Sequence, residues 1–150
     1  MKLFRAYLLS IVSIITVQAN EYKAVFDCSS GNSSYIKSRM WLVGKTIDMI
    51  EEKGDTASVA LTLHGKCVPM VSKSFDEVVD DKDIANTKEA QKWLIELSKR
   101  PNVKVIACSM SLQANDIDEE SVLPFITISE NSFIETIKYQ NEGYALMTFK

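Results

Sequence analysis

A thiol follows a predicted buried strand in the second half of the chain. Residues 103–107 are rich in β-branched apolar side chains, which predicts a strand, and Cys108 comes at its end. Open α/β sheets place reactive side chains at the carboxyl ends of their strands. As a thiolate Cys108 would be a nucleophile, and Ser109 and Ser111 are candidate hydrogen-bond donors to it. The alternative is a core residue, because free cysteine is often buried.

The other reactive side chains also follow predicted strands. Asp27 and Cys28 end the first one, and His64, the only histidine, ends the second, with Cys67 shortly after it. Since the carboxyl ends of parallel strands share one edge, we expect the three thiols and the imidazole to lie along one rim. The binding rim that we predict also includes polar and small residues at these ends: Asp27, Ser29, Gly65 and Ser109.

Several kinds of site fit this pattern poorly. A hydrolytic triad needs a base and an orienting acid, yet there is a single histidine and no Gly-x-Ser-x-Gly elbow. No Cys-x-x-Cys pair is present, so the spacing does not resemble a zinc site, and we predict neither a metal nor a cofactor. A protonated His64 or Lys66 would favour a thiolate at Cys108, whereas Asp27 would disfavour it.

The first 19 residues predict export. Two basic residues precede an apolar run over residues 6–17, and small or apolar residues stand where cleavage after Ala19 requires them, as in a signal peptide. An uncleaved anchor is the alternative, but about 20 apolar residues are needed to span a bilayer. We therefore predict a periplasmic or secreted protein, with no membrane association after cleavage. In such an oxidising compartment, an odd number of cysteines leaves at least one free, modified or paired between chains.

The mature part predicts one domain over residues 20–150. Its net charge of −5 and the lack of a basic patch argue against nucleic acid as a partner. Strands and helices alternate along it, which predicts a three-layer α/β/α sandwich with a mostly parallel sheet. The strands are expected at residues 22–28, 56–63, 103–108, 125–128 and 144–149, and the helices at 34–53, 87–99 and 132–140.

Three further local expectations concern helix faces and loops. Trp41 and Leu42 are expected to widen the buried face of the first helix. The charge run at residues 80–83 predicts a solvated loop, after an ambiguous segment at 69–79. Residues 116–124 predict a short acidic helix.

The order of these motifs resembles the DsrE/DsrF-like family, related to the YchN-like sulfur-relay proteins, over about residues 22–149. The matching pieces are Val25 to Gly31, His64-Gly65 followed by Val68-Pro69, Ala107-Cys108 with Leu112, and Ile117 through Leu123-Pro124 to residues 142–145. The resemblance implies a five-stranded flavodoxin-like sheet and assembly into a homotrimer or homohexamer. It also implies that a cysteine after the third strand carries sulfur as a persulfide, and Cys108 occupies that position.

The function predicted from the residues and the resemblance together is sulfur handling outside the cytoplasm. Cys108 would carry the persulfide, Cys67 or Cys28 would be a resolving thiol, and His64 would be auxiliary. The partner would be a sulfur donor or acceptor, either a protein or a small sulfur compound. Two alternatives stay open: a non-catalytic module that binds a small ligand or a metal, and an oligomeric interaction protein.

Overall fold

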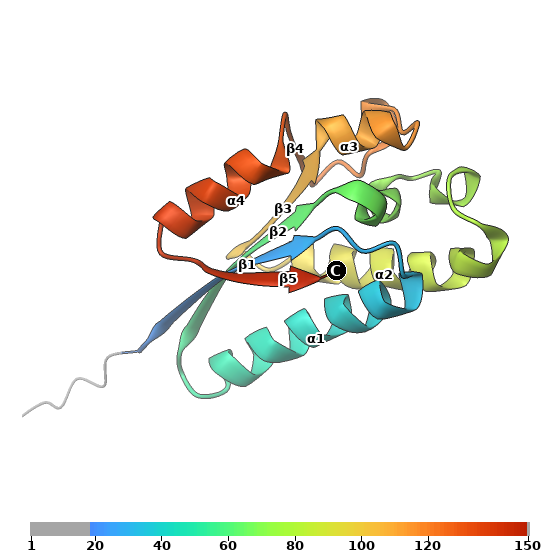
Figure 1. The fold of residues 1–150 in the computed structure, drawn as a ribbon. Helices are drawn as coiled ribbons and strands as arrows, with labels where there is room; N and C mark the ends of the chain where they lie inside the picture. Colours follow the sequence, from blue (N-terminus) through green and yellow to red (C-terminus); the bar gives the residue numbers. More distant parts are fainter. Residues whose placement is uncertain (1–18, 150) are drawn as a thin grey trace, which may run out of the picture.

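The core of the molecule is a five-stranded sheet in which every strand is parallel to its neighbours. The computed structural model describes residues 19–149, and the sheet has the strand order β4-β3-β2-β1-β5 (Figure 1). The strands are β1 Glu21–Cys28, β2 Thr56–Leu63, β3 Val103–Cys108, β4 Thr127–Ser129 and β5 Ala145–Phe149. The predicted parallel sheet is confirmed, so all five carboxyl ends meet at one edge.

Helices cover both faces, which confirms the predicted three-layer sandwich. The long helices α1 (Ser33–Glu51) and α2 (Asp81–Ser98) pack on one face, and α4 (Ser132–Asn141) lies on the other (Figure 1). The short helix α3 (Ser109–Ala114) follows β3 directly. Three 3₁₀ segments complete the described part: η1 (Gly65–Val71), η2 (Phe75–Glu77) and η3 (Glu119–Ser121).

The two faces of the sheet bury very different amounts of apolar surface. On the α1/α2 side, Met40, Ile47 and Leu94 pack against Leu61 and other strand residues in a large core. On the α4 side, the fully buried cluster consists of three strand residues flanked by two tyrosines: Val25, Ala60, Ile106, Tyr139 and Tyr144. Successive strand residues point to opposite faces of the sheet. The face on which a strand-end side chain lies therefore follows from the core cluster that holds the residues before it.

The predicted charged loop at residues 80–83 is wrong, because α2 begins at Asp81. Asp80 occupies the N-cap position, and Asp81 and Asp83 lie in the first turn. Carboxylates at this end of a helix interact favourably with the helix dipole, so the charge run starts the helix.

The expectation for Trp41 and Leu42 is also wrong. They are 44% and 41% exposed, so they do not widen the buried face of α1. The short acidic helix expected within residues 116–124 is confirmed in part. It consists of the single turn η3, because the Leu123 N–H donates to the Val71 carbonyl oxygen and the chain continues extended.

Nothing in the described structure bears on the predicted signal peptide, which falls outside the described residues except for Ala19. Among residues 19–149, no helix is both long enough and apolar enough to cross a bilayer.

Candidate functional site

Cys108 ends β3 on the α4 side of the sheet. Val105 and Ala107 belong to the core under α1 and α2, so the alternating Ile106 and Cys108 point the other way. The thiol is 4% exposed, and its Sγ lies 4.0 Å from the Glu130 carbonyl oxygen, just before α4. Cys108 is therefore enclosed between the end of the sheet, α3 and the start of α4.

Hydrogen-bond donors around Cys108 favour its thiolate. Burial raises the pKa of the thiol, but hydrogen bonds from the hydroxyl and backbone N–H groups of Ser111 and Ser132 outweigh burial, and the pKa lies below its ordinary value. Ser132 is buried in the first turn of α4, where the Asn131 side chain accepts from the Phe133 N–H. A thiolate is the nucleophilic form of cysteine, so the site favours reactivity.

Ser111 is fixed by the loop after β2. The Gly65 N–H donates to Ser111 Oγ at 2.9 Å, and Asn115 Nδ2 donates to the carbonyl oxygens of Gly65, at 3.1 Å, and Ser111, at 2.7 Å. Gly65 has φ +54°, a left-handed conformation that favours glycine, and a Cβ there would lie 3.4 Å from the Ser29 carbonyl oxygen. The predicted rim residues Ser29 and Gly65 thus lie together at this edge.

Ser109 does not serve the thiol as predicted. Its hydroxyl donates to Glu119 Oε1 at 2.7 Å, away from Cys108. The two serines after Cys108 therefore have different roles. Ser111 donates to the thiolate, and Ser109 donates to Glu119.

His64 and Asp27 form a pair on the same side of the sheet. His64 Nε2 lies 3.2 Å from the Asp27 carboxylate, and Thr62 Oγ1 donates to Asp27 Oδ1 at 2.9 Å. The hydrogen bond to Asp27 raises the pKa of His64 more than burial lowers it, and a Cys108 thiolate raises it further. Burial raises the pKa of Asp27, but the bonds from His64 and Thr62 lower it more, so the net shift is downward.

The backbone register brings His64 beside Cys108. Leu63 pairs with Ala107 on the neighbouring strand, and the chain stays extended at the next residue of each. The His64 ring then packs edge-on against Phe133 of α4, with 5.8 Å between ring centroids. The predicted meeting of histidine and thiol at one rim thus occurs, on the α4 side.

Cys28 and Cys67 lie on the other side and are bonded to each other. Both belong to the core under α1 and α2, and their disulfide joins the end of β1 to η1. Cys108 is the free cysteine. The two thiols predicted as resolving partners are thus tied up in this disulfide, and Cys28 is separated from Cys108 by β2 and by the plane of the sheet.

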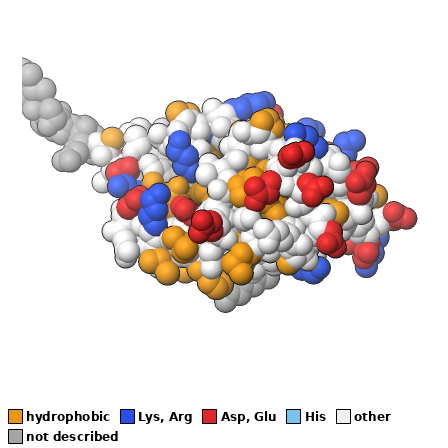
Figure 2. Space-filling view, turned by 90° about the horizontal axis from the view of Figure 1, so that it is seen from above, with side chains coloured by type: hydrophobic (Ala, Val, Ile, Leu, Met, Phe, Trp, Pro, Cys, Tyr) orange, Lys and Arg blue, Asp and Glu red, His pale blue; other side chains and the backbone are white. Residues whose placement is uncertain are grey.

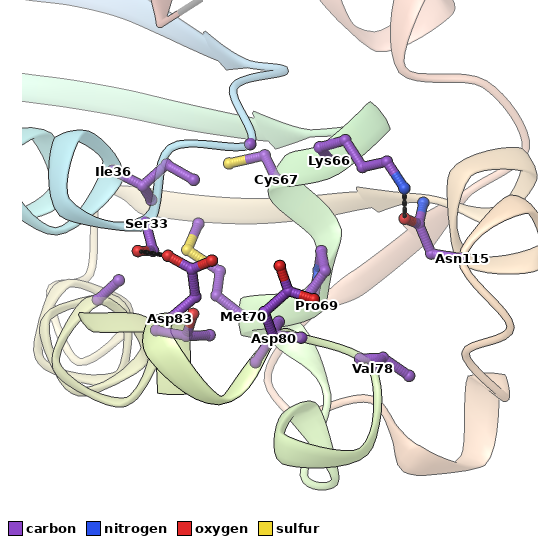
Figure 3. Close-up of a pocket in the computed structure, with 14 residues that line it drawn as sticks. Ser33, Ile36, Lys66, Cys67, Pro69, Met70, Val78, Asp80, Asp83 and Asn115 are labelled. Carbon is purple, nitrogen blue, oxygen red and sulfur yellow. Dashed lines mark hydrogen bonds between the residues drawn. The ribbon is translucent and has the colours of Figure 1, made fainter. Parts of the chain in front are cut away.

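A cavity of about 260 Å³ opens beside the disulfide (Figure 3). Cys67 and Met70 line it, and Ser33 Oγ donates to Asp83 Oδ1 at 2.5 Å on its wall. Its rim carries Lys66, whose Nζ donates to Asn115 Oδ1 at 3.4 Å. Neither Cys108 nor His64 lines this cavity, so it is a second feature of the same edge.

The part of the chain that the structure describes contains no cluster of side chains suited to binding a metal ion. Within residues 19–149 no three histidine, cysteine, aspartate or glutamate side chains lie close enough to hold one.

Reasoning from the sequence missed three polar contributors: Thr62, Ser132 and Thr136. In the sequence, Thr62 stands out only as a polar residue between two leucines of β2. Ser132 stands out only as a residue type that can cap a helix. Thr136 adds to the Asp27 site from α4, with its hydroxyl 3.5 Å from Thr62 Oγ1. These contacts depend on where α4 crosses the sheet.

Comparisons with known proteins agree with this architecture. The model of the DsrE/DsrF-like family matches residues 23–149. An uncharacterized protein of Aquifex aeolicus (strain VF5) is 29% identical over 147 residues, which are 98% of this chain and 65% of that protein. A solved structure of a protein of unknown function, MTH1491 from Methanobacterium thermoautotrophicum, superposes with a TM-score of 0.66 and 16% identity, covering 85% of this chain and 99% of that one.

Proposed function

The chain belongs to the DsrE/DsrF-like family, and from that premise we propose that it is an exported sulfur-relay protein whose Cys108 carries sulfane sulfur. The observation that carries the proposal is the state of Cys108. It is the one thiol outside the disulfide, and hydrogen bonds from Ser111 and Ser132 lower its pKa.

The proposed reaction exchanges one sulfur atom without net oxidation. The Cys108 thiolate attacks the outer sulfur of a donor persulfide, R–S–SH, so that an S–S bond forms on Cys108 while the donor's S–S bond breaks. Cys108 becomes a persulfide, and the donor leaves as a thiolate that takes up one proton. Transfer to an acceptor thiol follows the same steps in reverse. The donor and acceptor are proteins or small compounds that carry sulfane sulfur.

Two features support export to the periplasm or beyond the cell. The first is the apolar segment after two basic residues at the start of the chain. The second is the Cys28–Cys67 disulfide, because disulfides persist mainly in oxidising compartments. The disulfide also leaves Cys108 without an internal partner that would oxidise it.

We also propose that the protein assembles into a homotrimer or homohexamer through the α4 side. Helix α4 exposes Phe133, Ile134 and Ile137, at 62%, 56% and 58%, and Leu146 of the edge strand β5, which pairs with the α4-facing Val25, is exposed on the same side. Figure 2 looks onto this side from above and shows hydrophobic side chains gathered on it. Exposed apolar patches of this kind mark interaction surfaces.

The persulfide is tested by intact mass. The purified protein is incubated with polysulfide, and we expect one adduct of about 32 Da, removable by dithiothreitol. The Cys108→Ser variant should gain no adduct, whereas the Cys28→Ser/Cys67→Ser double variant should still gain one at Cys108. An adduct that persists in Cys108→Ser would contradict the proposal.

A second candidate function rests on the cavity beside Cys67, namely binding of a small ligand with no sulfur transfer. In that case Cys108→Ser would leave ligand binding unchanged, while Ser33→Trp, which fills the cavity, would abolish it. A thermal-shift screen of small polar and sulfur compounds on these two variants separates the two functions.

A further inference from the structure

Asp27, His64 and Cys108 come from three neighbouring strands and share the α4 side of the sheet. Asp27 is the last but one residue of β1 and points to the same side as Val25, His64 follows β2, and Cys108 ends β3. Because β2 lies between β1 and β3, the imidazole stands between the carboxylate and the thiol. The order across the sheet is therefore acid, imidazole, thiol.

The contacts of His64 leave one ring nitrogen available. An ionised carboxylate only accepts hydrogen bonds, so Nε2 must donate its proton to Asp27 across the 3.2 Å contact. Among the described residues, Nδ1 makes no hydrogen bond. The edge-on contact with Phe133 limits rotation of the His64 ring. Nδ1 can therefore accept a proton on the side of the sheet where Cys108 lies.

We infer that His64 is the proton carrier for Cys108 and that Asp27 is its positioning residue. This inference rests on the proposed sulfur transfer for its chemistry. The Cys108 S–H proton passes to His64 Nδ1, and the thiolate then attacks the outer sulfur of the donor persulfide. The departing donor thiolate takes the proton from the imidazolium, so the donor leaves as a neutral thiol and His64 returns to its neutral form.

The charges around His64 favour this role. From β1 it faces Asp27 and from β3 Cys108, whereas Lys66 of η1 reaches toward Asn115. From α4, Glu135 lies near Ser129 and is partnered by Lys138, and Phe133 contributes only an apolar ring. The thiolate raises the pKa of His64, and such coupling is reciprocal, so a protonated His64 favours the Cys108 thiolate. With the imidazolium between them, the Asp27 charge does not oppose the thiolate directly.

The chain allows each titration to be read at a single residue. His64 is the only histidine, so in protein without a histidine tag its imidazole proton resonance reports one pKa. Cys108 is the free thiol, so thiolate absorbance at 240 nm, with Cys108→Ser as the blank, reports the other. Neither measurement needs a sulfur donor, so neither depends on the proposed function.

We expect His64→Gln to shift the thiolate titration to higher pH and to slow iodoacetamide alkylation of Cys108 at pH 7 by about tenfold. Lys66→Gln removes a cation at the same edge of the sheet and should change neither the thiolate titration nor the alkylation rate of Cys108. Conversely, Cys108→Ser and Asp27→Asn should each lower the pKa of His64. His64→Asn provides a second variant if the first proves unfolded by circular dichroism.

The inference would be overturned if the thiolate titration of Cys108 were the same in wild type, His64→Gln and Lys66→Gln. It would also be overturned if Cys108→Ser left the pKa of the His64 resonance unchanged. Persulfide formation without this coupling would overturn the inference and leave the proposed function standing. Coupling without persulfide formation would support the Asp27–His64–Cys108 unit and reject sulfur carriage.

Discussion

Cys28 and Cys108 both end strands at the carboxyl edge of the sheet, yet their side chains lie on opposite faces. Cys28 is fully buried under α1 and α2 in a disulfide with Cys67, while Cys108 lies on the α4 side beside His64. The disulfide and the free thiol are therefore separate features. The first fastens η1 to the sheet, and the second is available for chemistry.

Thiol counting tests this separation. In denatured, unreduced protein, Ellman's reagent should detect one thiol per chain, because only Cys108 is free. Cys108→Ser should give none, and prior reduction of wild type should give three. Peptide mapping that found Cys108 in a disulfide with Cys28 or Cys67 would contradict the arrangement.

The disulfide should matter for stability more than the free thiol does. Its sequence separation is 39 residues, and closing a loop of this length restricts the unfolded chain. We expect Cys28→Ser/Cys67→Ser to lower the free energy of unfolding by roughly 2–4 kcal/mol, measured by urea denaturation. The matched control, Cys108→Ser, should lower the free energy of unfolding by less than the double variant does, because it breaks no covalent link.

Much of the fold is predictable from the sequence, because strand and helix periods are local properties. Residues 56–63 form β2 with the predicted bounds, since its alternate residues are apolar and fill the core under α1 and α2: Ala57, Val59, Leu61 and Leu63. The start of α2 was not predictable from apolar spacing, because its first turn consists of charged residues that interact with the helix dipole.

The candidate site was predictable only in part. Strand ends bring Asp27, His64 and Cys108 to one edge in any parallel sheet, but their pairing depends on the strand order. The expectation that Asp27 would oppose the thiolate assumed no intervening group, whereas His64 lies between the two strands that carry them. The Cys28–Cys67 bond likewise depends on which face each side chain takes, and cysteine spacing does not specify that.

The His64–Asp27 pair should stabilise the protein within a limited pH range. The pKa of His64 is raised on folding, so its contribution is complete below the unfolded value, about 6.5, and is lost as pH rises through the folded value. The pKa of Asp27 is lowered, so its contribution is present above about 3.9 and is lost as pH falls through the folded value.

His64→Gln should therefore lower the free energy of unfolding by roughly 1 kcal/mol at pH 5–6, and by progressively less above about pH 7. Urea denaturation at several pH values measures this. The exposed pair Lys82–Asp80, tested by Lys82→Gln, is the control and should show little effect at any pH. An effect of His64→Gln that grows with rising pH would have the wrong sign for this pairing.

The proposed assembly predicts sensitivity to charge on α4. Ile137→Glu places a carboxylate on the exposed apolar face and should convert the oligomer to monomers in size-exclusion chromatography with light scattering. Met49→Glu is a matched control, because Met49 is 60% exposed on α1, away from that face. A wild-type protein that is monomeric at high micromolar concentration would contradict the proposed oligomer.

The two serines that follow Cys108 provide a matched pair for the thiolate. Ser111 donates to the thiolate from its hydroxyl and backbone, whereas Ser109 donates to Glu119. Ser111→Ala removes one donor from a buried anion, so the pKa of Cys108 should rise and alkylation at pH 7 should slow by roughly threefold to tenfold. Ser109→Ala has the same change in composition two residues away and should alkylate at the wild-type rate. Equal slowing in both variants would mean that α3 as a whole, and not the Ser111 hydroxyl, controls the reactivity of Cys108.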